Sequence, residues 1–219
     1  MDPQFWHERW RRGEISWHRG DINAHLQEHW PRLGVVRGER VFVPLCGKTL
    51  DLLWLASQGY RVLGVELSQI AVEDFFTEHG LAPKVVSERS FRSYRVDELE
   101  VLCGDFFDLR PGHLDGVTAV YDRASLIALP PPMRPRYVEH LQSLVPAGTR
   151  ILLITLDYPQ EEISGPPFSV REYEVHALFD DRFEVQRLAD LDVWAESPRF
   201  QRRGLTSLLE HVYELRSRC

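Results

Sequence analysis

The stretch VFVPLCGKTLDLLWLASQGYRVLGVELS, residues 41–68, decides the fold of this chain. Val41–Leu45 is apolar and rich in β-branched residues, which predicts a buried strand that Gly47 ends. A helix is expected over Leu50–Ser57, and a second strand over Arg61–Leu67. Strand, helix and strand within about 30 residues form a βαβ unit, and such crossovers are almost always right-handed.

The same alternation of strands and helices continues along the chain. Helices are expected over Ala71–His79, Arg134–Leu144 and Arg171–Phe179, and strands over Glu100–Cys103, Thr118–Tyr121, Arg150–Leu156, Phe183–Leu188 and His211–Arg216. This order predicts an α/β fold with a doubly wound, mostly parallel sheet and helices on both faces. We expect one domain over residues 1–219, made of an N-terminal segment (1–34) and an α/β core (35–219).

The composition excludes several classes of function. A length of 219 residues with 43% hydrophobic content is enough for one sizeable core. The net charge of −7 argues against a nucleic-acid partner, and no apolar stretch approaches the ~20 residues of a membrane helix. The three cysteines, Cys46, Cys103 and Cys219, form no CxxC pair, which disfavours structural zinc and disulfides and favours a reducing, cytoplasmic location.

The N-terminal segment holds four of the six tryptophans, Trp6, Trp10, Trp17 and Trp30. Trp6 and Trp10 are four residues apart, so they share one face if this part of the chain is helical. One interpretation is that the tryptophans anchor the segment to the sheet. The other is that the segment forms a lid with aromatic walls over a ligand cleft, and both can hold together.

The Gly47-Lys48-Thr49 tripeptide resembles the end of a phosphate-binding loop of nucleotide hydrolases. Such a loop needs a glycine five positions before the Gly-Lys pair, where this chain has Phe42. Pro44, between them, has no backbone N–H to offer to an anion. A phosphate loop is therefore excluded, and the role of Lys48 stays open between the carboxylate of a cofactor and water.

Glu66 lies at the end of the second predicted strand, nineteen residues after Gly47. In doubly wound folds, an acid at this place accepts hydrogen bonds from ribose hydroxyls. A single glycine makes a poor pyrophosphate site, so a ligand with a ribose but no pyrophosphate fits both observations. S-adenosylmethionine is such a ligand. The alternative for Glu66 is an acid that pairs with the positive end of the next helix.

The run His25-Leu26-Gln27-Glu28-His29 matches the HxxEH pattern of some zinc peptidases. A pattern of five residues arises easily by chance in a chain with nine histidines. No third-ligand motif follows it, and the surrounding tryptophans suit a packed or surface helix. We therefore expect no metal site.

Polar residues follow the third and fourth predicted strands, where ligands bind in open α/β sheets. Asp105 is expected to contact an adenine amino group, with Phe106 stacking nearby, or else to cap the next turn. Arg123 is expected in the cleft. The alternative for Arg123 is a surface ion pair with Asp122.

Together these residues resemble the thiopurine S-methyltransferase family of class I S-adenosylmethionine-dependent methyltransferases, in its bacterial type. The motifs FWHERW (5–10), the stretch 41–68, YDRASLIALPP (121–131) and GPPFSV (165–170) carry the resemblance, which spans about residues 3–216. It implies a seven-stranded sheet, with the last strand inserted antiparallel, and a lid formed by the N-terminal segment.

The resemblance also implies site residues. The positions that contact the cofactor are Trp10, Leu45, Glu66 and Arg123, with the backbone at Asp105 and Phe106 contacting the adenine. Trp17 is implied to lie beside the methyl acceptor, as is Arg123 and one further arginine among Arg199, Arg202 and Arg203.

The activity implied is methyl transfer from S-adenosylmethionine to the sulfur of a small aromatic or heterocyclic thiol, such as a thiopurine, by in-line displacement. No catalytic acid or base is expected, because such thiols are largely ionised near neutral pH; Asp122 is the nearest candidate if one is needed. Alternatives are a halide, selenium or tellurium acceptor, a nicotinamide-dependent oxidoreductase, or a cofactor-binding module without activity. We expect a monomer with no membrane or nucleic-acid partner.

Overall fold

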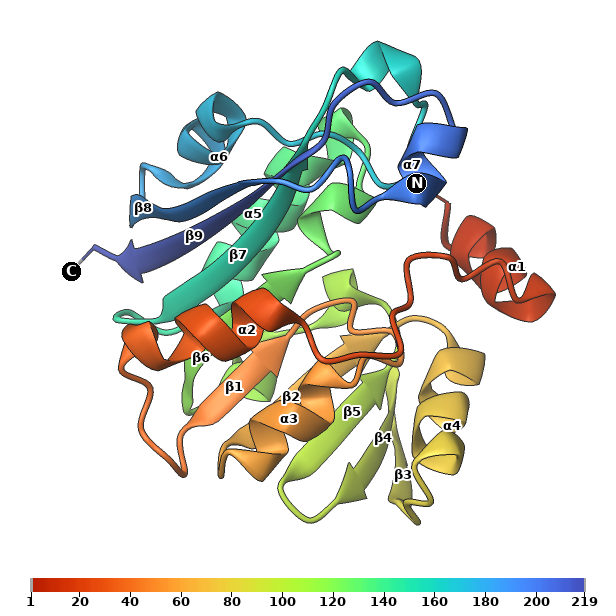
Figure 1. Ribbon diagram of the computed structural model, residues 1–219. Coiled ribbons are helices and arrows are strands. Elements are labelled where there is room, and N and C mark those ends of the chain that lie inside the picture. Colours follow the sequence, from red (N-terminus) through yellow and green to blue (C-terminus); the bar gives the residue numbers. More distant parts are fainter. Residues whose placement is uncertain (1, 219) are drawn as a thin grey trace.

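In the computed structural model, which describes residues 2–218, the strands form one nine-stranded sheet of order β3-β4-β5-β2-β1-β6-β7-β9-β8 (Figure 1). The strands are β1 Arg40–Val43, β2 Arg61–Glu66, β3 Lys84–Glu88, β4 Phe91–Val96, β5 Leu99–Cys103, β6 Val117–Arg123, β7 Arg150–Asp157, β8 Phe183–Asp192 and β9 Leu209–Ser217. The helices are α1 Pro3–Arg12, α2 Ala24–His29, α3 Asp51–Ser57, α4 Gln69–Glu78, α5 Arg134–Leu144, α6 Glu172–Phe179 and α7 Pro198–Arg202.

Helices cover both faces of this sheet, which confirms the predicted doubly wound fold. Apolar side chains of α2, α3 and α4 pack in one buried cluster, and those of α5 and α6 pack in another. In β1, Val41 and Val43 belong to the first cluster while Phe42 belongs to the second. Successive side chains of a strand point to opposite faces, so a strand that is apolar throughout is buried on both.

The seven predicted strands are confirmed, and β9 is inserted antiparallel between β7 and β8 as expected. The prediction of seven strands in total was wrong, because β3 and β4 extend the sheet beyond β5 as an antiparallel pair. All five residues of β3 are exposed, so this edge strand lacks the apolar pattern by which a strand is recognised in a sequence.

The βαβ unit begins and ends close to the predicted residues. β1 ends at Val43, because Pro44 follows it and Leu45 has a left-handed backbone with φ of 44°. The hydroxyl of Ser68 accepts the N–H of Ala71 and so caps α4, as predicted. These caps place the carboxyl ends of β1 and β2 side by side, since the two strands pair in parallel.

The N-terminal segment (residues 1–34) packs against the sheet near its C-terminal end, at Trp30, whereas the helix α1 at its start lies apart from the sheet (Figure 1). Trp30 is fully buried and meets the rings of Tyr60 and Tyr121 edge-on, which confirms the anchoring role for this tryptophan. Figure 1 shows α1 set apart from the sheet, and α1 contacts α4. Among the described residues, no helix combines the length and the apolar character needed to cross a membrane.

Candidate functional site

A cleft of about 910 Å³ opens at the carboxyl ends of β1, β2, β5 and β6. The loops that follow these strands form one side of it, and the N-terminal segment and the region before β9 form the other. Such a size is typical of a site for a small molecule. All the site residues predicted from the sequence line this cleft: Trp10, Trp17, Leu45, Glu66, Asp105, Phe106 and Arg123.

The turn after β1 is held in a strained backbone conformation. Leu45 and Ala124, which follow β1 and β6, both have positive φ angles, of 44° and 63°. Non-glycine residues adopt this region rarely, and they do so most often at functional sites. The Ser125 hydroxyl donates to the Pro44 carbonyl at 2.7 Å and so joins the two turns. The turns after β1 and β6 are therefore held together by a hydrogen bond at the cleft.

Glu66 is 6% exposed and reaches the cleft from the end of β2. One carboxylate oxygen accepts the N–H of Gly47 at 2.9 Å, and the other accepts the N–H of Ser68 at 2.7 Å. Burial raises the pKa of this carboxyl, and the backbone N–H groups act against that rise. A carboxylate has about four acceptor positions, so about two remain for donors in the cleft.

These contacts bear on both interpretations of Glu66. The bond to Ser68, the N-cap of α4, is the helix-start contact expected under the alternative. The bond to Gly47 fixes the β1 turn against β2 and orients the carboxylate. The residue thus serves the fold while presenting spare acceptors to the cleft, as a pair of ribose hydroxyls would require.

Lys48 is held by α4. It is 7% exposed, and its Nζ lies 2.5 Å from a carboxylate oxygen of Glu78 and 3.8 Å from one of Asp74. Its Nζ therefore forms ion pairs with two acids of α4. Contact with the carboxylate of a cofactor stays a prediction, since Lys48 also lines the cleft.

Three tryptophans form an aromatic wall, which we define as Trp6, Trp10 and Trp17. The Trp17 ring meets the Trp6 ring edge-on at 5.3 Å and the Trp10 ring at 5.9 Å. A Cβ on Gly47 would stand 3.4 Å from the Trp10 ring, so the glycine lets this ring approach the β1 turn closely. Trp6 was missed as a site residue, although its spacing of four from Trp10 was the available signal.

Asp105 and Phe106 follow β5. The Asp105 carboxylate accepts the N–H of Phe107 at 2.9 Å and caps a short 3-10 helix, as one of the two interpretations predicted. The Phe106 ring is 2% exposed and packs against the rings of Phe42 and Tyr137. Stacking of Phe106 on an adenine is therefore disfavoured, and contact of the adenine with the backbone of these residues stays a prediction.

Asp122 does not form the ion pair with Arg123 that the sequence allowed. Its side chain is fully buried, where it accepts the Tyr137 hydroxyl at 2.7 Å and the Leu126 N–H at 3.2 Å. Asp122 is also not among the residues that line the cleft. Adjacent residues of β6 point to opposite faces of the sheet, so Asp122 turns into the core while Arg123 turns to the cleft.

This burial makes a testable contribution to stability. Burial raises the pKa of Asp122 from 3.8 to about 6, despite hydrogen bonds from Tyr137, Leu126 and Ser125 that lower it. The folded state then binds the proton more tightly than the unfolded state, so stability falls as the pH rises from about 4 to about 7. The loss from this group is about 3 kcal/mol, at 1.36 kcal/mol for each pKa unit.

We expect Asp122→Asn to remove this loss. The free energy of unfolding of the variant, relative to that of the unmutated protein, should rise by about 3 kcal/mol between about pH 4 and about pH 7. Urea denaturation across this range measures the difference. Parallel pH profiles for the two proteins would contradict the assignment.

Of the four arginines predicted to lie near the methyl acceptor, two line the cleft and two do not. Arg123 lines the cleft, and its guanidinium makes no hydrogen bond or ion pair with any residue in the described chain. Arg199 also lines the cleft, and its guanidinium donates to the Ser16 carbonyl in the N-terminal segment. Arg202 and Arg203 are exposed and do not line it. Of the three candidates left open, Arg199 is the one placed at the site.

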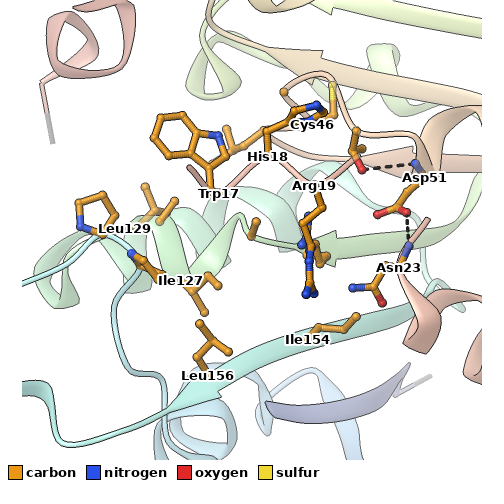
Figure 2. A pocket seen from close by; sticks show the side chains of 18 of the residues that line it. Trp17, His18, Arg19, Asn23, Cys46, Asp51, Ile127, Leu129, Ile154 and Leu156 are labelled. Carbon is orange, nitrogen blue, oxygen red and sulfur yellow. Dashed lines mark hydrogen bonds between the residues drawn. The ribbon is translucent and has the colours of Figure 1, made fainter. Parts of the chain in front are cut away.

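Apart from Trp17, the part of the cleft shown in Figure 2 was not predicted. Trp17, Ile127 and Leu129 gather on one side of the view, and Arg19, Asn23 and Asp51 on the other. The Asp51 carboxylate holds this polar side, since it accepts the Asn23 N–H at 2.8 Å and the Tyr121 hydroxyl at 3.0 Å. Glu210 of β9 lines the cleft as well. These residues come from distant parts of the chain, without a shared motif.

His18 shows how closely the N-terminal segment approaches the strand ends. Burial lowers the pKa of His18, and the charges of Lys48 and Arg123 lower it further. His18 also lines the cleft. The lowered pKa favours the neutral form of the imidazole beside the positive charges of Lys48 and Arg123.

Known proteins resemble this chain over its whole length. The family model of thiopurine S-methyltransferase matches residues 1–218. A thiopurine S-methyltransferase of Nitrosospira multiformis is 51% identical over 218 residues, which is 100% of this chain and 99% of the relative. One of Pseudomonas entomophila is 53% identical over 215 residues, covering 98% and 99%.

Solved structures agree with the fold. The 1,6-didemethyltoxoflavin-N1-methyltransferase of Burkholderia thailandensis, crystallised with S-adenosylhomocysteine, has a TM-score of 0.63 at 17% identity and covers 99% of this chain and 87% of its own. An S-adenosylmethionine-dependent methyltransferase of Anabaena variabilis has a TM-score of 0.63 at 13% identity, covering 99% and 95%.

The residues of the cleft and the relatives lead to one conclusion. The β1 turn, the acid at the end of β2 and the open strand ends suit an adenosine ligand that lacks a pyrophosphate. The family match extends over every motif on which the resemblance rested. The chain belongs to the thiopurine S-methyltransferase family and is an S-adenosylmethionine-dependent methyltransferase.

Proposed function

We propose that this enzyme methylates the sulfur of a small aromatic or heterocyclic thiol, such as a thiopurine. The observation that carries the proposal is the position of Arg123, whose guanidinium borders the same cleft as the aromatic wall and has no ionic partner of its own among residues 2–218. A fixed positive charge in a cleft of low dielectric favours an anionic ligand. The aromatic wall favours a flat one.

We further propose how the chain holds S-adenosylmethionine, which supplies the methyl group and departs as S-adenosylhomocysteine. The spare acceptor positions of Glu66 would bind the ribose hydroxyls, and the backbone at Asp105 and Phe106 would contact the adenine. Trp10 and Leu45 would border the sulfonium and the amino-acid end. A tryptophan face near a sulfonium adds a cation–π attraction of about 0.5–2 kcal/mol.

Orientation, rather than proton transfer, is the proposed source of the rate. Aromatic thiols ionise near neutral pH, so the acceptor needs no base. Asp122, the nearest candidate, is buried and already bonded to Tyr137 and Leu126, which supports a mechanism without it. Holding two reactants in line contributes about 7–11 kcal/mol in well-oriented systems. Trp17, on the aromatic wall, would position the acceptor ring.

The N-terminal segment would act as a lid. Its aromatic wall faces the β1 turn, and the bond from Arg199 to the Ser16 carbonyl joins it to α7 across the cleft. Two otherwise separate elements are thus tied over the reacting atoms. Excluding water in this way strengthens the electrostatic interactions inside the site.

A methyl-transfer screen tests the acceptor. The purified enzyme is offered aromatic thiols, thiopurines, hydrosulfide, halides, and selenium or tellurium oxyanions, with formation of S-adenosylhomocysteine as the readout. The highest kcat/KM is expected with aromatic or heterocyclic thiols. A higher value with halides or with the selenium or tellurium oxyanions would replace the proposal by the alternative acceptor class.

The remaining expectations from the sequence stay predictions. These are a single domain over residues 1–219, a monomeric state and a cytoplasmic location.

Burial raises the pKa of Cys46 well above its ordinary value and that of Cys103 to about 11, so neither thiol is activated. Cys219 lies outside the described residues.

A further inference from the structure

The helix α2 carries three potential metal ligands that the methyl-transfer chemistry does not use. His25, Glu28 and His29 each offer one ligand atom, and these atoms all lie within 4.8 Å of one another. His25 and His29 are separated by one helical turn, and their rings stack with centroids 6.0 Å apart. The HxxEH run, set aside as a chance pattern in the sequence, therefore brings its donors together.

His29 is a buried imidazole without a hydrogen-bond partner. Its exposure is 5%, and neither ring nitrogen forms a hydrogen bond with any residue in the described chain, while Nε2 lies 3.9 Å from a carboxylate oxygen of Glu28. A buried polar group left without a hydrogen bond destabilises the folded state, and each such group calls for a specific explanation, such as a water or an ion.

His25 has a carboxylate partner on one ring nitrogen, as metal-binding histidines usually do. Its Nε2 lies 3.0 Å from a carboxylate oxygen of Glu210, while its Nδ1 is buried and unbonded in the described structure. A proton on Nε2, donated to Glu210, leaves a lone pair on Nδ1. Histidines that bind metals almost always donate their other N–H to a carboxylate or carbonyl in this way.

We propose that His25, Glu28 and His29 bind one divalent transition-metal ion, with Zn²⁺ as the representative, and that Glu210 orients His25 behind it. Two imidazoles and a carboxylate are a ligand set that Zn²⁺ accepts, with a water in the fourth position. Glu28 is exposed and gives the ion a route from solvent.

The spacing of the donors allows such a site. Two ligand atoms of a tetrahedral zinc lie about 3.4 Å apart, given Zn–N distances of about 2.1 Å. Closing the donor set from 4.8 Å requires movements of about 1 Å or less for each side chain. The site would fix the start of α2, whose neighbours Asn23 and Ala24 line the cleft. It lies outside the residues proposed to contact the cofactor.

Calorimetric titration of the full chain with Zn²⁺, after treatment with a chelator, tests the proposal. One ion per chain is expected, and Co²⁺ in its place should give the visible absorption bands of a tetrahedral site. Glu28→Gln, at an exposed position, and His29→Gln should each weaken Zn²⁺ binding at least tenfold. Glu210→Gln should weaken it about 10–100-fold, as loss of an outer carboxylate does.

His176→Gln is the matched control. His176 stands on α6 one turn before Asp180, with its Nδ1 3.0 Å from that carboxylate. It thus presents an exposed histidine–acid pair with the spacing of four residues that separates His25 and His29. This variant should bind Zn²⁺ as the unmutated protein does. Absence of one-to-one binding, or unchanged affinity in Glu28→Gln, would overturn the proposal. Thermal midpoints should rise with Zn²⁺ in the control and not in Glu28→Gln.

Discussion

Replacing Glu66 by alanine is expected to weaken the binding of S-adenosylhomocysteine by about 3–6 kcal/mol, or about 10²–10⁴-fold in Kd. Each hydrogen bond to a charged group contributes about 1.5–3 kcal/mol, and the proposed site has two, one for each ribose hydroxyl. The carboxylate is already oriented by the N–H groups of Gly47 and Ser68, so little of this energy is spent on ordering it. Isothermal titration calorimetry measures the loss directly.

The same substitution also disturbs the fold, and the two effects must be separated. Alanine leaves the N–H groups of Gly47 and Ser68 without their acceptor, so thermal stability is expected to fall as well. Glu100→Ala is the matched control. Glu100 lies on β5 next to β2, and its carboxylate accepts bonds from Ser93 and Arg95, but it does not line the cleft.

Glu100→Ala should lower the thermal midpoint and leave the affinity for S-adenosylhomocysteine unchanged. Glu66→Gln, which keeps the size of the side chain, should lose less affinity than Glu66→Ala. If Glu66→Ala bound the product as tightly as the unmutated enzyme does, the carboxylate would belong to the fold alone and the ribose contact would have to be made elsewhere.

The sequence predicted the elements whose signal is local. In the βαβ unit, apolar runs, Gly47 and the cap at Ser68 are all readable within a few residues, and the structure confirms them. The edge strand β3 was missed because its exposed residues have no core to face, and its pairing with β4 is fixed by backbone bonds rather than by side chains. Local pattern reading is weakest where burial does not constrain the sequence.

The residues of the cleft also fall into those that local sequence predicts and those that depend on the three-dimensional fold. Glu66 and Arg123 were found because the ends of parallel strands gather at one edge of a sheet. Glu210 could not be found, since β9 reaches the cleft only through its insertion between β7 and β8. The inward turn of Asp122 was predictable in principle, because adjacent residues of a strand face opposite sides.

Replacing Arg123 by alanine is expected to lower kcat with an anionic aromatic thiol by about 10²–10³-fold, the range found when one preorganised donor is removed from an active site. The reason is that Arg123 has no ionic partner in the described chain, so its charge is available to the acceptor and is not replaced by another group. Steady-state kinetics with a series of thiols of graded acidity gives the measurement. The loss should be largest for the thiols that are most fully ionised.

The controls separate charge from geometry. Arg123→Lys keeps the charge but not the planar fork, and should recover part of kcat. Arg202→Ala removes an exposed arginine outside the cleft and should leave the kinetics unchanged. Arg123 is also proposed to border the cofactor, so S-adenosylhomocysteine affinity is measured in parallel and should change less than kcat does. Because thiolate acceptors need the charge and neutral ones do not, an equal loss across the whole thiol series would assign Arg123 to the cofactor instead of the acceptor.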